Sequence, residues 1–344
     1  MTWAALLLAD PSPCLRWLAL RDLLGRAEDD AEVRELSPLR TGDPLVADLV
    51  ARQQPDGSWL GLGAGAQAGV VASTSLALTR LGYLGFGAEF APVARGAEYL
   101  WARQEADGRW PLASLADEER EGARDAYTMK PLQTAQPLRA LAACGYAQDT
   151  RAERAYEWLL AQRLEDGAWP TGIVAGVLGG VGGYRRLAHS RWGCRSSTTA
   201  ALAALALHPH RRHKEPARRG LDLLLGRETR EEQTLGFEVA RTLGVEEARG
   251  SLTHFARFDS AQVLDLCARI GLGREDGRVA DMVAFVSRLQ GPYGLWEYAR
   301  RPQASRWVTL DLLRSLSALE QGSDWVSREP RTPFQPYPQR PRRY

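Results

Sequence analysis

A short motif recurs along this chain and constrains its fold more than any other sequence feature. Gln53–Trp59 spell Gln, two variable residues, Asp, Gly, one variable residue and Trp, and Gln104–Trp110 repeat this pattern. Gln162–Trp169 carry it with one extra residue, and Gln290–Trp296 are a degenerate copy. The Trp residues are 51, 59 and 127 positions apart, so we expect that one copy has been lost within 221–237. Such a period predicts a repetitive architecture.

Each part of the motif has a physical role that favours a structural unit. The residues before the Gln have the pattern of an amphipathic helix. Asp and Gly form a turn, because Asp bonds nearby backbone groups and Gly adopts a positive φ. The Trp ring can pack against a neighbouring repeat, and the Gln amide can bond backbone groups at a helix end. We therefore expect the motif to hold the scaffold together rather than to bind a substrate.

Two types of helical segment alternate along the chain. Outer-type segments have mixed charge, whereas inner-type segments are small and apolar on nearly every side, which is typical of buried helices. The outer-type segments are 44–54, 90–104, 150–163, 215–226 and 276–290. The inner-type segments are 12–24, 73–82, 133–144, 197–207, 259–270 and 305–319. The sequence thus predicts an all-α fold, an α/α toroid of about six helical hairpins with parallel inner helices around a central cavity. No strand is expected, because glycines interrupt the one β-like run, 172–184.

The motif closely resembles the Q-x-x-D-G-x-W repeat of squalene–hopene cyclases, oxidosqualene cyclases and protein prenyltransferase β subunits. The resemblance covers roughly residues 40–320. It implies a terpenoid cyclase-like toroid and an isoprenoid-like ligand, whereas the reaction depends on site residues. The D-x-D-D acid cluster of the squalene–hopene cyclases does not occur in this sequence. Asp265–Cys267 spell the D-x-C of the prenyltransferase zinc site, but they lie in an apolar helix and no His follows them.

Composition and charge are those of an ordinary globular protein, with 44% hydrophobic and 25% charged residues and a net charge of +2. We expect no nucleic-acid partner. The four Cys are far apart in the sequence, so we expect free thiols, as in the reducing cytoplasm.

Residues 1–9 are too short for a signal peptide, and no run reaches the ~18 apolar residues of a membrane span. We expect a cytoplasmic protein with one domain over 1–327 and an extended Pro/Arg-rich tail over 328–344, and the oligomeric state stays open.

The links from outer to inner helices are long, roughly 105–132, 164–196 and 227–258, and we expect the site on the face where they gather. A basic residue stands beside the start of four inner helices. Cations are disfavoured at helix N-termini, so this recurrence needs a reason. Either these residues hold an anionic ligand together with the helix ends, or they pair with loop carboxylates. The four residues are Lys130, Arg195, Arg257 and Arg306.

Asp259 is the candidate catalytic residue. It stands between Phe258 and Ser260 at the start of an inner helix. Cyclases of the oxidosqualene type carry an acid at a similar place, before a small hydroxyl residue. A lone Asp needs a raised pKa to protonate an alkene, and a plain N-cap is the alternative interpretation.

Further candidate ligand-binding residues lie near the expected mouth of the cavity. Aromatic rings there could line the cavity and stabilise cations. Cys194, with Arg195 adjacent and His189 nearby, could be a nucleophile or a lining thiol. The remaining candidates are Trp110, Tyr127, Trp192, His254 and Trp307.

The glycine-rich run 172–184 lacks a phosphate-binding signature. It is open to three interpretations: a lid, a peripheral contact with a membrane, or a packed loop. No metal site and no cofactor are expected. The three His within 208–213 lie on a basic turn without an acid or thiol beside them.

Three functions remain open. The first is an enzyme or binding protein for an isoprenoid-like or other amphipathic anionic ligand in the central cavity, without the D-x-D-D cluster. The second is a carbohydrate-active lyase or hydrolase, in which Arg neutralises a uronate and Tyr127 or His254 is the base. The third is a catalytically silent scaffold. The sequence does not decide whether the protein is an enzyme.

Overall fold

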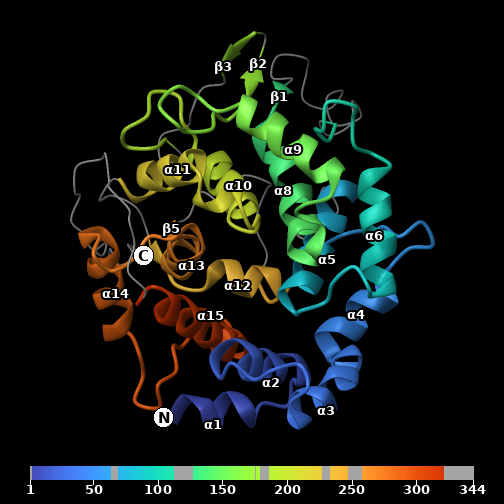
Figure 1. Ribbon diagram of the computed structural model, residues 1–344, viewed down its shortest axis with the longest axis vertical. Helices are drawn as coiled ribbons and strands as arrows, with labels where there is room; N and C mark the ends of the chain where they lie inside the picture. The colour runs from blue at the N-terminus through green and yellow to red at the C-terminus, as the bar shows by residue number, and fades with distance from the viewer. Residues whose placement is uncertain are drawn as a thin grey trace, which may run out of the picture.

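The fold is a ring of helices, seen here in a computed structural model that describes residues 2–62, 69–111, 127–174, 176–178, 186–226, 233–246 and 258–320. Figure 1 shows the outer helices at the rim and the inner helices within it. The outer helices are α3 (Ala31–Leu39), α4 (Pro44–Arg52), α6 (Ala91–Trp101), α9 (Thr150–Ala161), α11 (Glu215–Leu225) and α14 (Gly277–Arg288). The inner helices are α2 (Pro13–Leu18), α5 (Val70–Tyr83), α8 (Pro131–Leu141), α10 (Arg195–Leu205), α13 (Ser260–Ile270) and α15 (Ser305–Ala318). The predicted α/α toroid is confirmed.

Hairpins form as predicted, because each of the first five inner helices packs on the outer helix that follows it. The packed pairs are α2 with α3, α5 with α6, α8 with α9, α10 with α11 and α13 with α14. Inner helices also pack side by side, α5 on α8, α8 on α10 and α13 on α15. Two inner helices continue as π-helical turns, η1 (Ala19–Leu23) after α2 and η4 (Ala142–Tyr146) after α8. Short 3₁₀ turns are η2 (Arg40–Gly42), η6 (Arg211–His213) and η7 (Pro302–Ala304).

The motif residues hold the ring together, as predicted. Each motif Trp is at most 1% exposed, and its ring N–H donates to a carbonyl ten residues earlier, on the outer helix, at 2.7–2.9 Å. Its main-chain N–H donates to a Thr hydroxyl of the next inner helix. These hydroxyls belong to Thr74, Thr134, Thr198 and Thr309. One Trp therefore joins an outer helix, a turn and an inner helix.

The Gln of the motif ties its turn to the next outer helix. Gln53 Nε2 donates to the carbonyls of Gly57, at 3.0 Å, and of Pro92 in α6, at 2.9 Å. Gln104 makes the same two bonds, to its own turn and to α9. In the third copy Arg163 stands four residues before the Gly, in place of Gln, and pairs with Glu215 of α11 at 2.8 Å. Because of the extra residue, an ion pair of Arg163 with α11 replaces the Gln hydrogen bond to the next outer helix that the first two copies make.

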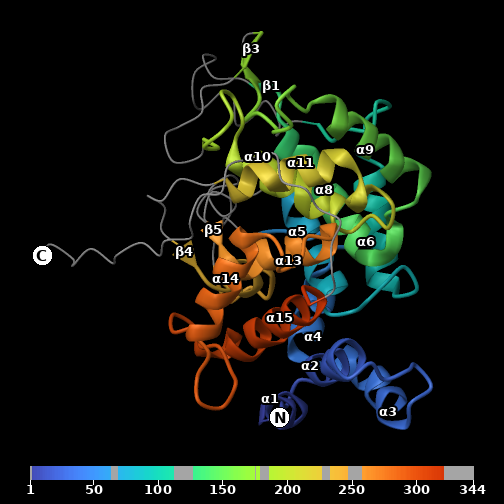
Figure 2. The same cartoon turned by 60° about the vertical axis from the view of Figure 1, so that its left-hand side comes forward.

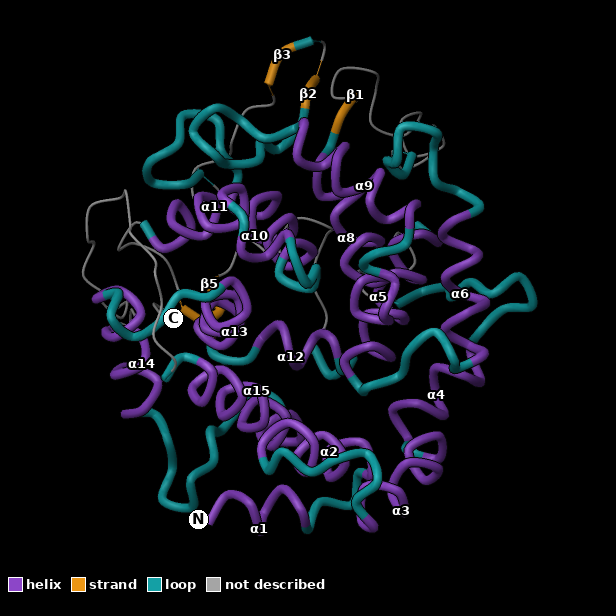
Figure 3. Tube along the Cα trace, in the orientation of Figure 1, coloured by secondary structure: helices purple, strands orange, loops and turns teal. Residues whose placement is uncertain are grey.

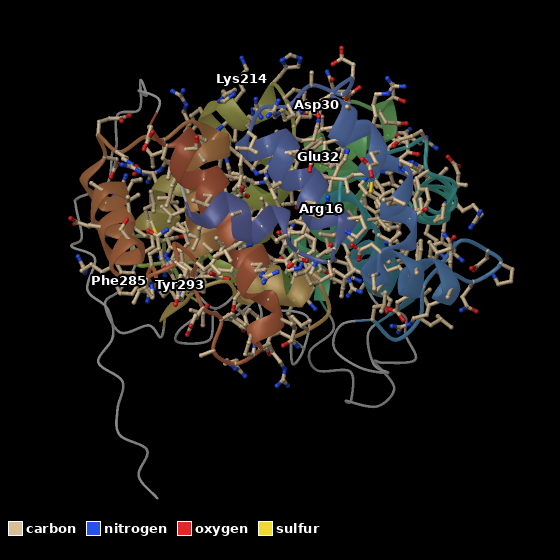
Figure 4. All side chains as sticks on the ribbon, turned by 90° about the horizontal axis from the view of Figure 1, so that it is seen from below. Arg16, Asp30, Glu32, Lys214, Phe285 and Tyr293 are labelled. Atoms are coloured by element: carbon tan, nitrogen blue, oxygen red, sulfur yellow. The ribbon has the colours of Figure 1, made fainter. Side chains whose placement is uncertain are left out.

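The first hairpin contains a helix that the sequence analysis did not predict. Asp30 is the N-cap of α3, and its Oδ1 accepts the N–H groups of Glu32 and Val33. Arg16 of α2 lies 3.8 Å from the Glu32 carboxylate, and Figure 4 shows the two side chains together. Helix α1 (Thr2–Leu8) was also not expected. Among the described residues no helix has the length and the apolar character that a membrane crossing requires.

The last inner helix closes the ring against the start of the chain. Arg306 of α15 pairs with Asp10 at 2.6 Å, and Arg314, two turns later, bonds to Asp22 of η1. Helix α15 packs directly on η1. The tail expected over 328–344 lies outside the described residues.

Helix α12 (Phe237–Thr242) lies inside the ring, within the segment 227–258 that we expected to be a link. It packs against α5 and α15, and Glu238 reaches Arg139 of α8. Figures 1 and 3 show α12 crossing the middle of the ring, between α5 and α13. The interior is therefore partly filled by a short helix.

Two small sheets correct the expectation that no strand forms. Tyr127–Met129 (β1), Ile173–Val174 (β2) and Val177–Leu178 (β3) make an antiparallel sheet, although glycines flank the last two. Gly176 takes φ 78° in the turn between β2 and β3, so one of those glycines favours the hairpin. Gln233–Thr234 (β4) pair in parallel with Phe258–Asp259 (β5). In Figure 2, β1 and β3 lie at the top of the molecule, and β5 lies lower, in contact with α13.

We predict that Gly108→Ala destabilises the protein far more than Gly145→Ala. Both glycines have positive φ, 95° and 91°, so both variants incur about 1–2 kcal/mol of backbone strain. A Cβ at Gly108 would lie 2.5 Å from the main chain of Arg154, whereas a Cβ at Gly145 meets nothing within 4 Å. We expect the contact to cost a further ~2 kcal/mol or more in urea unfolding. Equal destabilisation of the two variants would contradict this role of the motif Gly.

Candidate functional site

The starts of the inner helices carry several of the predicted site residues. Lys130 is the N-cap of α8, Arg195 is the first residue of α10, and Asp259 is the N-cap of α13. Trp307 is the third residue of α15. The predicted candidates Arg257 and His254 lie outside the described residues.

The predicted basic residues have different surroundings. Lys130 is half-buried, and burial lowers the pKa of its ammonium group. Arg195 is 1% exposed. The guanidinium of Arg306 is engaged by Asp10, as described above. An anion site shared by Arg195, Arg257 and Arg306 stays a prediction.

The predicted aromatic residues are mostly part of the packed structure. Trp110 is a motif Trp whose ring N–H donates to Leu100 O at 2.9 Å. Trp307 is 5% exposed, and its ring lies 5.9 Å from the ring of Tyr83. Trp192 is half-buried beneath the guanidinium of Arg191, 5.3 Å away. Tyr127 belongs to strand β1.

Cys194 and His189 differ in their access to solvent. Cys194 is 0% exposed, and its main-chain N–H donates to Trp169 O at 2.8 Å. His189 lies on an exposed turn, in contact with Gly226 at the end of α11. Because the Cys194 thiol has no access to solvent, its position favours a buried structural residue over a nucleophile that attacks a substrate.

Asp259 caps two helices at once. Its Oδ1 accepts the N–H of Ala261 in α13, at 3.1 Å, and the N–H of Gly236 before α12, at 2.8 Å. Its Oδ2 accepts the N–H of Glu238 at 2.7 Å. The side chain is 2% exposed, and burial raises its pKa to about 6 against the opposing effect of these bonds. The carboxylate therefore fixes the start of α12 to the start of α13.

An ion cluster surrounds α12 at the centre of the ring. Arg139 of α8 lies 2.5 Å from Glu238 Oε1, and Arg241 donates to both oxygens of Glu238, at 2.7 and 2.9 Å. Arg80 of α5 is 5% exposed and donates through Nε to Thr242 O, at 2.6 Å. Burial lowers the pKa of the Arg80 guanidinium. We call Arg80, Arg139, Arg241 and Glu238 the central cluster.

The central cluster was not predicted from the sequence. Its local signal is a Glu–Arg pair three residues apart, Glu238 and Arg241, between Gly236 and Gly244. The partner residues Arg80 and Arg139 are distant in the sequence, and no local pattern connects them to α12.

The His-rich turn is structural. His208 is 2% exposed, and its Nε2 lies 2.8 Å from Glu153 Oε1. Its Nδ1 accepts the N–H groups of His210 and Arg211. Within the described residues, no group of three or more His, Cys, Asp or Glu could hold a metal ion.

Comparison with known proteins supports the recognised repeats. Residues 40–183 match the family model of the squalene-hopene cyclase C-terminal domain, and this span contains the first three motif copies. The resemblance to terpenoid cyclases is thereby confirmed. No curated protein matches the chain.

Solved structures are similar at low identity. A protein from Actinoplanes is 17% identical, with a TM-score of 0.44 over 93% of this chain and 89% of that one. The type II terpene cyclase MstE from Scytonema is 15% identical, with a TM-score of 0.32 over 79% of this chain and 95% of that one. A variant of MstE in complex with geranylgeranyl dihydroxybenzoate is 15% identical, with a TM-score of 0.33 over 80% and 95%.

We predict that Asp259→Asn costs about 1–3 kcal/mol of unfolding free energy, because an Asn has only one oxygen for the three N–H groups. Asp30→Asn is the matched control, since Asp30 caps α3 through Oδ1 alone. Asn caps a helix about as well as Asp, so the control should be nearly neutral. Equal, small effects in chemical denaturation would mean that Asp259 is an ordinary N-cap.

The Asp259 pKa predicts a pH dependence of stability. Its folded pKa of about 6 lies above its ordinary value of 3.8, so the folded state holds the proton more tightly. The contribution is complete below about pH 4 and is lost as the pH rises through about 6. Two units correspond to roughly 3 kcal/mol. Unfolding curves at several pH values should show this slope in the wild type and a smaller one in Asp259→Asn; identical slopes would contradict the assignment.

Proposed function

We propose that this terpenoid cyclase-like toroid binds an amphipathic, isoprenoid-type ligand with an anionic head inside its ring. The match to the squalene-hopene cyclase family model supports the isoprenoid part of the ligand. The central cluster supports the anionic head, and it is the observation that carries the proposal. Guanidinium groups of α8 and α12 contact Glu238 there, and the guanidinium group of Arg80 in α5 bonds to the end of α12 at Thr242.

The guanidinium groups of the central cluster offer N–H donors that suit an anion. Arg139 and Arg241 contact the carboxylate of Glu238, and Arg80 bonds to a carbonyl oxygen. Charges interact more strongly in a buried site than in water. Guanidinium groups bind phosphate and carboxylate oxygens through paired N–H groups. A diphosphate or carboxylate head is therefore a suitable ligand at this place.

The surroundings of Asp259 favour binding over cyclisation by proton transfer. Both oxygens of the carboxylate accept backbone N–H groups. A protonated Asp259 would have to give up at least one of these bonds before it could present its proton to an alkene. The sequence offers no D-x-D-D cluster in its place. We therefore propose a binding function without alkene protonation by this acid.

We predict that geranylgeranyl diphosphate binds more tightly than geranylgeraniol, which has the same chain without the charge. Arg80→Gln should weaken the diphosphate about 10- to 100-fold, the scale for one charge-assisted hydrogen bond, and leave the alcohol unchanged. Isothermal titration calorimetry measures both affinities, and the diphosphate affinity should fall with salt.

The control for this experiment is Arg154→Gln, since Arg154 lies exposed on α9. Arg80→Lys provides a second variant that keeps the charge if the Gln variant does not fold. Equal affinities for the diphosphate and the alcohol, or no binding of either, would refute the proposal.

We also predict that the purified protein forms no hopene from squalene, because the chain lacks the D-x-D-D cluster that supplies the proton. Gas chromatography of an extract after incubation checks this. Appearance of hopene would show that another acid initiates the reaction.

A further inference from the structure

A second polar cluster involves the neighbouring inner helices α13 and α15. On α13, Gln262, Asp265 and Arg269 are spaced three and four residues apart and share one face. On α15, Asp311 and Ser315 are four residues apart and also share a face. Helices α13 and α15 pack against each other.

Contacts connect Asp265, Arg269 and Asp311 with Tyr83 and Arg314, and Gln262 and Ser315 lie one helical turn from Asp265 and Asp311. Tyr83, the last residue of α5, donates its hydroxyl to Asp311 Oδ1 at 2.8 Å. Arg314 lies 3.3 Å from the same oxygen. Arg269 donates to Asp265 at 2.8 Å, and the charges of Asp265 and Arg269 act on Asp311. We call this set the lower cluster.

The lower cluster is enclosed by protein, yet solvent reaches it. Burial is the main cause that raises the pKa of Asp311 to about 6. The Asp311 side chain is nevertheless 18% exposed, and those of Asp265 and Arg269 are 35% and 40% exposed. Side chains that are both surrounded and wetted are typical of the wall of a binding site.

Several polar atoms of the lower cluster make no hydrogen bond within the described part of the chain. Ser315 is 2% exposed, lies one turn after Asp311 on the same face of α15, and makes no hydrogen bond through its Oγ. Gln262 Nε2 and Arg314 Nε also make none. A buried polar group without a partner costs about 1–3 kcal/mol, so such groups in one place indicate a bound molecule that supplies the partners.

The charges of the lower cluster select the class of ligand. The carboxylates of Asp22, Asp265 and Asp311 disfavour an anion, and the guanidinium groups of Arg269 and Arg314 disfavour a cation. A neutral molecule with many hydroxyl groups can donate to the carboxylates and accept from the Ser, Gln and Arg donors.

Aromatic rings complete the fit to a sugar. Tyr83 and Trp307 lie beside the lower cluster, with ring centroids 5.9 Å apart, and Trp307 precedes Asp311 by one helical turn. Their apolar surface suits the C–H groups of a pyranose or cyclitol ring. We propose that the lower cluster binds a neutral polyhydroxylated ligand, such as a sugar or a cyclitol.

Ring closure alone does not account for the lower cluster. The bond from Arg314 to Asp22 joins α15 to η1 and explains why Arg314 lies there. It supplies no partner for Ser315 Oγ or Gln262 Nε2. The lower cluster shares no residue with the central cluster, so the two proposals succeed or fail separately.

The test is a titration of the full-length protein with neutral probes, glucose, maltose and myo-inositol, and with charged probes, putrescine and inorganic phosphate. Thermal unfolding and calorimetry report binding, because a ligand of the folded state raises Tm. We expect at least one neutral probe to raise Tm at roughly 50 mM, whereas putrescine leaves Tm unchanged and any shift caused by phosphate, which suits the central cluster, is the same in Ser315→Ala.

Ser315→Ala should weaken the neutral probe about 3- to 10-fold and leave the stability of the free protein unchanged, since the hydroxyl has no partner to lose. The matched control is Ser317→Ala, an exposed position on the same helix. The proposal is overturned if no neutral probe binds. It is also overturned if Ser315→Ala weakens the binding of putrescine or phosphate, or if Ser315→Ala and Ser317→Ala bind the neutral probe with equal affinity.

Discussion

The bonds of the motif Trp residues are the contacts on which the rest of the ring depends. Each indole bonds back to the outer helix that precedes it, and each Trp main-chain N–H bonds forward to a Thr of the next inner helix. The ring is fully buried between them, so the hydrogen bonds are shielded from water and the apolar contacts add to them. Because every copy links one hairpin to the next, the toroid follows from repetition of a local contact.

The interior depends on the one place where this contact is missing. No motif Trp occurs between α11 and α13, and near the end of α11 the guanidinium of Arg278 donates to the carbonyl of Asp222, at 3.4 Å. Arg278 of α14 also pairs with the Asp222 carboxylate of α11 at 2.7 Å. An ion pair therefore joins the outer helices α11 and α14 where the motif Trp is missing. Helix α12 begins at Phe237, where the segment 221–237 that we expected to have lost the motif ends, and Asp259 fixes this helix inside the ring. The central cluster therefore lies at the one step of the ring where a copy of the motif is missing from the sequence.

The repeats could be predicted from the sequence because their signals are local. The expected segments 197–207 and 259–270 agree closely with α10 and α13, since a helix apolar on all sides has few alternatives. Helix α12 could not be predicted in this way, because an isolated helix of six residues is unstable and needs tertiary contacts. The strand Ile173–Val174 was wrongly excluded, since its partner Tyr127–Met129 lies far away in the sequence. The position of Asp259 at a helix start was predicted correctly. Its bond to Glu238 was not, because that bond requires α12, which was not predicted.

The position of the charges bears on which part of an amphipathic ligand the centre of the ring can accept. A hydrocarbon chain placed against Arg80, Arg139 and Glu238 would remove water from these groups without replacing its hydrogen bonds, which is costly for buried charges. An anionic head would instead supply acceptors to the same guanidinium groups. The polar side chains of the lower cluster oppose a hydrocarbon chain for the same reason. The proposed ligand would therefore enter head first, and its apolar chain would extend from the centre toward the starts of the inner helices.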